Sequence, residues 1–140
     1  MKIYIASDHR GLELKENLKK NFNLIDLGTN SSKSVDYPIY AFKLAEKIAG
    51  TDNLGIAICG SGIGISIACN KVKGIRCAKV NTIKEAKYTR LDNDSNIIAI
   101  SGEMSYQKAV RVVEEFINTK FSGLERHIKR IEEIKEYENK

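Results

Sequence analysis

LGIAICGSGIGISIACNK, residues 54–71, is the stretch that decides the fold of this chain. It begins with an isoleucine-rich apolar run over 54–58, which is typical of a strand buried on both faces of a parallel sheet. Cys59 and a glycine-rich turn over 60–64 follow, and 65–71 then mixes small and apolar residues as a packed helix does. A strand, a glycine turn and a helix in this order direct backbone N–H groups toward an anion. We therefore predict an anion-binding site at this turn.

Strands and helices are predicted to alternate along the rest of the chain. Further β-prone runs occupy 2–6, 24–27, 76–80 and 96–100, and helical patterns occupy 12–22, 36–50, 83–91 and 105–119. Asp36 is placed to cap the second of these helices, with Pro38 in its first turn. The alternation predicts an α/β fold, a doubly wound, Rossmann-like, five-stranded parallel sheet with helices on both faces.

The polar segments next to these strands are expected to meet at one edge of the sheet. In open parallel sheets, ligands bind beyond the carboxyl ends of the strands. Asp8 follows the first strand, Cys59 ends the third, and Asp92–Asn93 lies shortly before the fifth. We expect all three to converge at the carboxyl edge.

The final stretch, 122–140, differs from the rest. Its apolar residues, at 124, 128, 131 and 134, form a narrow stripe on a highly charged helix. So thin a stripe favours packing on another subunit over packing on its own core. We expect a homodimer; whether two dimers join into a tetramer stays open.

Composition excludes several classes of protein. The 140 residues suit one domain, 1–140, and are 42% hydrophobic with a formal charge of +5. No apolar run approaches the roughly 18 residues of a membrane span, and the N-terminus does not read as a signal peptide, so a soluble, cytoplasmic protein without membrane partners is expected. Lysines are scattered among glutamates with no interleaved aromatics, which argues against nucleic acid. The positive charge equally fits a phosphorylated small molecule.

The cysteines and histidines do not form a metal-site pattern. Cys59, Cys69 and Cys77 contain no CxxC pair, and the two histidines are far apart in sequence. Reduced thiols are expected, with Cys69 and Cys77 packed as small apolar groups. We predict neither a metal nor another cofactor.

Six segments carry a resemblance to a known family. They are SDHRG at 7–11, DYP at 36–38, ICGSGIGISIACNK at 58–71, KGIR at 73–76, NDSN at 93–96 and RHIKR at 126–130. At these segments the chain resembles the ribose-5-phosphate isomerase B family, which includes the galactose-6-phosphate isomerase subunits. The segments run in order nearly from end to end of the chain.

The resemblance implies metal-free interconversion of D-ribose 5-phosphate and D-ribulose 5-phosphate through an enediolate, with Cys59 as the base. Proton abstraction next to a carbonyl needs a base beside an oxyanion hole, and a thiol at a helix N-terminus suits the first role. The enediolate oxygens are expected to be held by the Ser61 hydroxyl and by the backbone N–H groups of the turn, which comprises Gly60, Ser61, Gly62, Ile63 and Gly64. Glycines there let the backbone approach the ligand closely.

The resemblance assigns roles to residues outside this turn as well. Asp8 would hydrogen-bond sugar hydroxyls or assist ring opening, and His9 would face the phosphate or a hydroxyl. Asn93 is matched to a substrate-binding amide, and Tyr37 is expected to line the pocket.

Arg126 and Arg130 lie four residues apart, so on a helix they share a face and can clamp one phosphate. By spacing alone, a solvated face is the alternative. The resemblance favours phosphate binding, in the site of a partner subunit.

Two residues depart from the family pattern. Asp92 stands where these enzymes usually carry a histidine that acts as acid and base in ring opening. A carboxylate is a poor proton donor at pH 7 unless burial favours its neutral form. Glu103 replaces the usual phosphate-binding arginine, and pairing with Arg126 or Arg130 is one alternative for it. Enolisation can survive both changes.

Three alternatives follow from these departures and from the fold. The substrate can be a six-carbon sugar phosphate, such as galactose 6-phosphate or allose 6-phosphate, handled by the same base and oxyanion hole. The protein can also be a non-catalytic sugar-phosphate binder that retained the pocket, an alternative that Asp92 keeps open. A flavodoxin-like nucleotide or signalling module is disfavoured, because the glycine spacing in 60–64 is wrong for a dinucleotide fingerprint.

Overall fold

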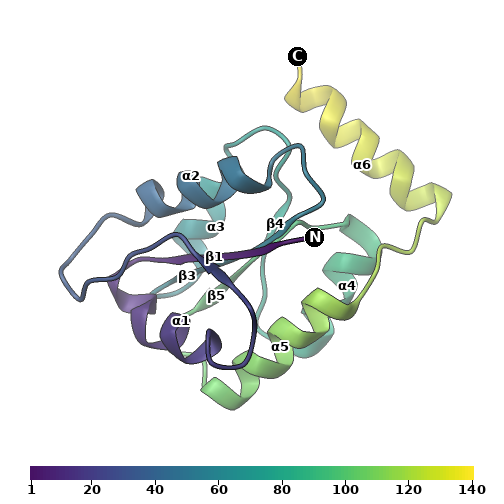
Figure 1. Cartoon of the computed structure of the whole chain (residues 1–140). Coiled ribbons are helices and arrows are strands. Elements are labelled where there is room, and N and C mark those ends of the chain that lie inside the picture. The colour runs from purple at the N-terminus through teal and green to yellow at the C-terminus, as the bar shows by residue number, and fades with distance from the viewer.

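The computed structural model describes residues 1–140 and is built around a five-stranded, all-parallel sheet in the order β2-β1-β3-β5-β4 (Figure 1). The strands are β1 (Ile3–Ser7), β2 (Ile25–Asp26), β3 (Leu54–Cys59), β4 (Cys77–Lys79) and β5 (Ile97–Ser101). All five lie within a residue or two of the predicted runs. The predicted doubly wound α/β fold is confirmed.

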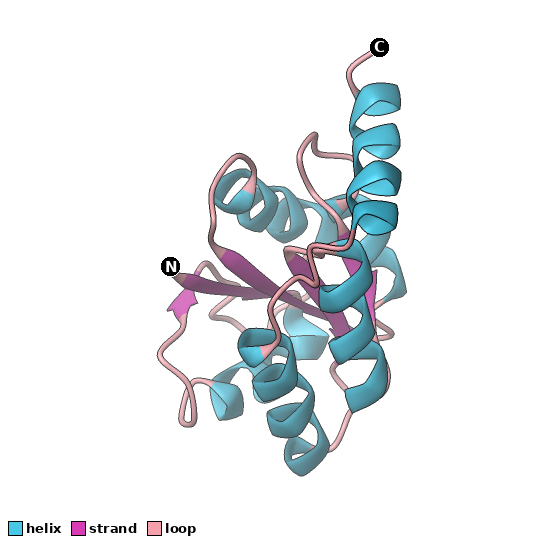
Figure 2. Cartoon of the chain, turned by 90° about the vertical axis from the view of Figure 1, so that its right-hand side faces the viewer, coloured by secondary structure: helices cyan, strands magenta, loops and turns pink.

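Helices cover both faces of the sheet (Figures 1 and 2). One face packs against α2 (Tyr37–Ile48) and α3 (Ile63–Cys69). The other face packs against α1 (Leu12–Leu18), α4 (Ile83–Asn93) and α5 (Tyr106–Asn118). Pro38 lies in the first turn of α2 as predicted, but the carboxylate of Asp36 makes no capping hydrogen bond. A short 3-10 helix, His9–Gly11, joins β1 to α1.

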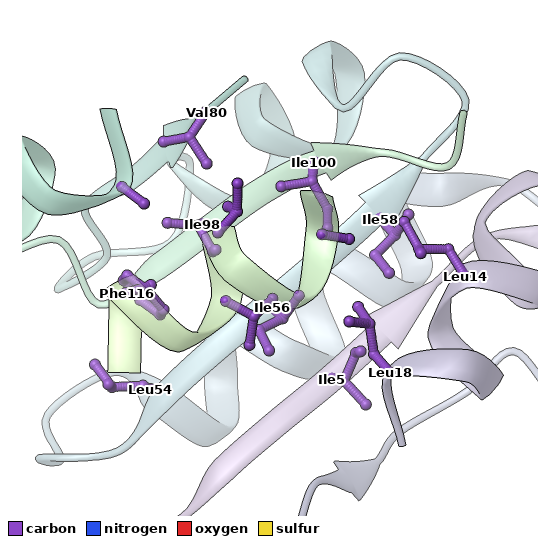
Figure 3. Close-up of a cluster of buried hydrophobic side chains, with 14 residues drawn as sticks. Ile5, Leu14, Leu18, Leu54, Ile56, Ile58, Val80, Ile98, Ile100 and Phe116 are labelled. Carbon is purple, nitrogen blue, oxygen red and sulfur yellow. The ribbon is translucent and has the colours of Figure 1, made fainter. Parts of the chain in front are cut away.

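The hydrophobic core has two halves, one on each face of the sheet, because successive side chains along β3 point to opposite faces. Ile56 and Ile58 point to the α1 and α5 side, where they join the cluster that Figure 3 shows, whereas Ala57 and Cys59 point to the α2 and α3 side. All six residues of β3 are buried. Burying an isoleucine side chain stabilises the fold by about 1.5–3 kcal/mol, so the register of this strand is strongly specified.

The strand order creates a crevice between β1 and β3. The chain leaves β1 for β2 on one side and returns across to β3 on the other, which makes these strands the topological switch point of the sheet. The N–H of Asp8 donates to the carbonyl of Ile58 at 3.1 Å. The residues that end β1 and β3 therefore lie side by side.

The last helix, α6 (Glu125–Glu138), extends away from the rest of the chain (Figures 1 and 2). It buries His127 and Ile131, while Leu124, Ile128 and Ile134 of the predicted apolar stripe remain exposed. None of the helices combines the length and the apolar character that crossing a membrane requires.

A buried lysine ties α1 to β2 and to the loop that follows. The side chain of Lys15 is fully buried, and its Nζ lies 2.5 Å from Asp26 Oδ2, 3.2 Å from Glu16 Oε2 and 3.3 Å from Asn30 Oδ1. Lys19 Nζ reaches the same Asp26 oxygen at 2.8 Å. Burial alone would raise the pKa of Asp26, but the hydrogen bonds from Lys15 and Lys19 outweigh it and hold this pKa below its ordinary value.

Replacing Lys15 by Met should therefore destabilise the protein in a pH-dependent way. Removing one partner of a buried pair typically costs about 3–5 kcal/mol, and we expect about 3 because Lys19 still pairs with Asp26. Since the pKa of Asp26 is lowered on folding, its contribution is present above pH 3.8 and is lost as the pH falls through the folded value. Urea unfolding should thus show a smaller difference between Lys15→Met and wild type in acid than at pH 7. Lys20→Met is the exposed control, and an equal loss in that variant would contradict the assignment.

Candidate active site

A cavity of about 330 Å³ opens at the carboxyl edge of the sheet, at the crevice between β1 and β3. Its lining residues are Asp8, Arg10, Tyr37, Cys59, Gly60, Ser61, Ile63 and Gly64. They come from the segment that follows β1, from the start of α2, and from the end of β3 with the turn and the first residues of α3. Seven of these eight residues, all but Arg10, are residues that the sequence singled out as candidates for the site.

Cys59 is the last residue of β3, and its sulfur faces the glycine turn. Its side chain is almost fully buried, and Sγ accepts a hydrogen bond from the N–H of Gly62 at 3.2 Å. The carbonyl of Cys59 accepts from the N–H of Gly102 at 2.8 Å, so the backbone around the thiol is held from the β5 side as well. The thiolate is the form of a cysteine that acts as a base.

The turn after Cys59 is fixed by short polar contacts. Ser61 Oγ accepts from the N–H of Ile63 at 3.1 Å, and the carbonyl of Gly60 accepts from Ser101 Oγ at 2.7 Å. Gly62 has a φ of +80°, and a Cβ built on it would lie 2.9 Å from the backbone carbon of Ile100. Only glycine fits this position without strain.

Gly62→Ala should accordingly damage both the turn and the fold. A non-glycine residue in the left-handed region costs about 1–3 kcal/mol, and here the added methyl group also meets backbone. Gly50→Ala is a matched control, because Gly50 has a φ of +75° but nothing within 4 Å of the place that a Cβ would take. Thermal unfolding should show the larger loss for Gly62→Ala. Equal losses in the two variants would contradict a steric role for Ile100.

Asp8 and His9 present polar atoms next to this turn. Asp8 Oδ1 accepts from the N–H groups of Arg10 and Gly11 at 3.0 and 3.1 Å, which leaves Oδ2 available to a ligand hydroxyl. His9 Nδ1 accepts from the N–H of Val35 at 3.1 Å. The proton of a neutral His9 ring is therefore on Nε2, which can donate outward. His9 adjoins the cavity through Asp8 and Arg10 but does not itself line it.

Arg10 was not singled out from the sequence, and its pairing with Glu103 was not predicted. Its guanidinium lies over Gly60, and its Nη2 is 3.8 Å from Glu103 Oε1. Within the chain, Glu103 pairs with Arg10 and not with Arg126 or Arg130. An arginine next to an aspartate and a histidine gave no distinctive sequence signal.

The remaining predicted residues lie elsewhere, which corrects the expectation that Asp92–Asn93 converges with Asp8 and Cys59. Helix α4 runs back from the carboxyl edge to the amino edge, so its last residues precede the start of β5. Cys59 is in register with Ser101 at the other end of that strand. The rise of about 3.3 Å per residue puts roughly 13 Å of β5 alone between the two edges.

Asp92 and Asn93 belong to a second polar group, together with the start of α6. Asp92 Oδ1 lies 3.4 Å from His127 Nε2, and Asn93 Oδ1 accepts from Thr89 Oγ1 at 3.3 Å. Arg126 and Arg130, on either side of His127, are exposed. His127 was missed as a polar partner of Asp92, although it stands between the two arginines in the RHIKR segment.

The two other cysteines lie outside the cavity. The pKa of Cys69 is strongly raised, first by its hydrogen bond with Cys77 and then by burial, so Cys69 remains a neutral thiol. Cys77 is partly buried. No group of three or more His, Cys, Asp or Glu side chains is arranged to hold a metal ion.

Comparison with known proteins agrees with this geometry. A family model described as ribose/galactose isomerase matches residues 3–134. The chain belongs to this family. Ribose-5-phosphate isomerase B of Mycolicibacterium paratuberculosis is 37% identical over an alignment of 146 positions, which covers 99% of this chain and 92% of that protein.

Two solved structures share the whole fold with this chain. The structure of ribose-5-phosphate isomerase B from Mycoplasma genitalium with bound ribulose-5-phosphate has a TM-score of 0.93 and 38% identity, covering 99% of this chain and 97% of that one. The enzyme of the same name from Clostridium thermocellum has a TM-score of 0.91 and 41% identity, covering 99% and 98%. The predicted resemblance and the predicted isomerase class are thereby confirmed.

Proposed function

We propose that this protein interconverts D-ribose 5-phosphate and D-ribulose 5-phosphate by an enediolate mechanism in which Cys59 is the base. The observation that carries the proposal is the placement of Cys59 Sγ, 3.2 Å from the Gly62 nitrogen, in a cavity that also contains Asp8 and Ser61. Membership of the ribose/galactose isomerase family supports the substrate class. So do relatives named as ribose-5-phosphate isomerase B, one of them with bound ribulose-5-phosphate.

The reaction moves one proton between neighbouring carbons of the open-chain sugar. The Cys59 thiolate removes the proton from C2 of the aldose, and the electron pair of that C–H bond forms the C1–C2 double bond of the enediolate. A proton is then delivered to C1 and the proton of the C2 hydroxyl moves to the C1 oxygen, so that C1 becomes an alcohol carbon and C2 becomes the carbonyl carbon of the ketose. Negative charge develops on the sugar oxygen, where the turn after Cys59 supplies N–H groups and the Ser61 hydroxyl. One such donor is typically worth about 10²–10³ in rate.

Asp8 and His9 suit the orientation of the substrate. Asp8 uses one carboxylate oxygen to fix the 3-10 turn and keeps the other for a sugar hydroxyl. The outward Nε2–H of His9 can reach a hydroxyl or a phosphate oxygen. Tyr37, at the start of α2, closes the side of the cavity near Gly64.

The site is completed by a second copy of the chain, which forms a homodimer with shared sites. Within one chain, the group containing Asp92, Asn93, Arg126 and Arg130 is too far from Cys59 to act on the same substrate. Helix α6 extends from the body and exposes Leu124, Ile128 and Ile134, which a partner surface could cover. In the dimer, the arginines of one subunit would bind the phosphate in the site of the other.

The pairing of Asp92 with His127 supplies an acid and base for ring opening. Asp92 would act on the sugar ring in the partner's site, and the imidazole 3.4 Å away can exchange a proton with it. Histidine is the side chain best suited to such transfer near neutral pH. A local partner of this kind offsets the poor proton-donating ability of a lone carboxylate.

Cys59→Ala should abolish turnover of ribose 5-phosphate. The expected loss is at least about 10³-fold in kcat, because the variant has no base to form the enediolate. Turnover is measured in EDTA, so that a metal-dependent route is tested at the same time. Cys77→Ala is the matched control, since Cys77 does not line the cavity, and it should keep wild-type kcat. An active Cys59→Ala protein would remove Cys59 as the base.

The same assay separates the alternative substrates. A wild type that is inactive on ribose 5-phosphate but turns over galactose 6-phosphate or allose 6-phosphate would shift the assignment to a six-carbon sugar. A wild type that binds these sugars and turns over none of them would be a sugar-phosphate binding protein.

Co-expression of Cys59→Ala and Arg130→Ala chains should restore activity at a substrate concentration too low for the Arg130→Ala homodimer, whose KM should be strongly raised by the loss of a phosphate contact. With random pairing, about half of the dimers are mixed and each has one intact site of two, which predicts about a quarter of wild-type activity. Different affinity tags on the two chains allow the mixed dimer to be purified for the assay. Two differently tagged Cys59→Ala chains are the control and should stay inactive. A mixed dimer with no activity would contradict shared sites.

A further inference from the structure

Arg10 and Glu103 form an ion pair at the mouth of the cavity. Arg10 Nη2 lies 3.8 Å from Glu103 Oε1, and the two side chains are 61% and 81% exposed. A pair so open to water contributes little to stability, typically about 0–1 kcal/mol. Stability therefore does not account for an arginine at this place.

The backbone holds these two side chains opposite each other. A Cβ built on Gly102 would collide with the carbonyl oxygen of Arg10, so the turn after β5 packs directly on residue 10. That turn is fixed by the N–H of Gly102, which donates to the Cys59 carbonyl at 2.8 Å, and by the N–H of Glu103, which donates to Ser101 Oγ at 3.0 Å. Glu103 is thus kept beside the cavity by the same contacts that fix Cys59.

The guanidinium of Arg10 also lies against the catalytic turn. A Cβ built on Gly60 would collide with Cζ and Nη1 of Arg10. Among the cavity-lining residues Arg10 is the only cation, and Asp8 is the only anion. Guanidinium binds phosphate through paired hydrogen bonds, and a carboxylate uses the same N–H groups.

We propose that Arg10 binds the phosphate group of the substrate and that Glu103 competes with this phosphate for Arg10. Binding then exchanges the carboxylate for the phosphate on the guanidinium, and Glu103 lowers the affinity for substrate and product alike. The proposal rests on the proposed function in taking a sugar phosphate as the substrate. It adds a phosphate-binding residue in the same subunit as Cys59, and a residue that sets its affinity.

The test is a double-mutant cycle on the binding of inorganic phosphate, measured by calorimetry without turnover. Arg10→Gln should weaken phosphate binding by about tenfold, the loss of a charge-assisted contact. Glu103→Gln should tighten it by about two- to fivefold, the size expected from removing an exposed competing charge. In the Arg10→Gln background, Glu103→Gln should have almost no effect.

Each other outcome overturns the proposal. Unchanged phosphate affinity in Arg10→Gln removes Arg10 as a ligand. An equal gain from Glu103→Gln with and without Arg10 means that Glu103 acts as a general negative charge. Glu46→Gln tests the same point independently, because the Glu46 side chain is exposed on α2 and makes no ion pair or hydrogen bond. A gain in phosphate affinity like that of Glu103→Gln would also contradict competition. Both substituted side chains are exposed, so the variants should fold.

Kinetics then distinguishes this proposal from the proposed function. If ribose 5-phosphate is the substrate, Arg10→Gln should raise KM with little change in kcat, since the phosphate is remote from the reacting carbons. If Arg10→Gln instead lowers kcat and leaves KM unchanged, Arg10 contacts the enediolate, and the phosphate assignment is overturned. If the wild type is inactive on ribose 5-phosphate but the phosphate-binding cycle behaves as expected, the proposed function fails and the role of Arg10 stands.

Discussion

The parallel pairing of β1 with β3 is the constraint on which the rest of the site depends. Ser7 is in register with Ile58, and the N–H of Asp8 donates to the Ile58 carbonyl, so Asp8 and Cys59 emerge together at the carboxyl edge. A slip of one residue would turn Ile56 and Ile58 to the α2 and α3 side, where the smaller Ala57 and Cys59 now pack, and would leave the other cluster underfilled, at a cost of several kcal/mol. The packing that stabilises the sheet therefore also sets the separation between the proposed base and the carboxylate.

The turn after β3 places a backbone hydrogen-bond donor at the sulfur of Cys59. Gly62 directs its N–H to the sulfur, and Ser101 on the neighbouring strand holds the Gly60 carbonyl. Because these groups are fixed by hydrogen bonds within the chain, the proposed reaction would need little reorganisation of the turn when charge develops on the substrate. The fully buried strand behind the turn supplies the rigidity, which short polar contacts in a solvent-exposed loop could not supply alone.

The sequence predicted those features that depend on one continuous segment. The run over 54–71 indicated a buried strand, a glycine turn and a helix, and its cysteine lies at the cavity as expected. The expected convergence of Asp92–Asn93 with Cys59 was wrong because α4 returns to the amino edge before β5 begins. The Arg10–Glu103 and Asp92–His127 contacts were not predictable, since each joins polar residues far apart in sequence whose neighbours carry no periodic signal.

The residues that line the cavity and the group around Asp92 and α6 differ in how firmly their own chain fixes them. This difference affects how the proposed dimer would form its sites. The group at the carboxyl edge is built on buried strands, whereas Arg126 and Arg130 sit on a helix that buries only His127 and Ile131. A helix that packs so little of its surface is weakly held by its own chain, because most helical stability in proteins comes from tertiary contacts. Covering the exposed side of α6 with a partner would order the helix and bring its arginines to the partner's cavity in one step. In such a dimer, the contacts that stabilise the assembly would be the same ones that complete the site.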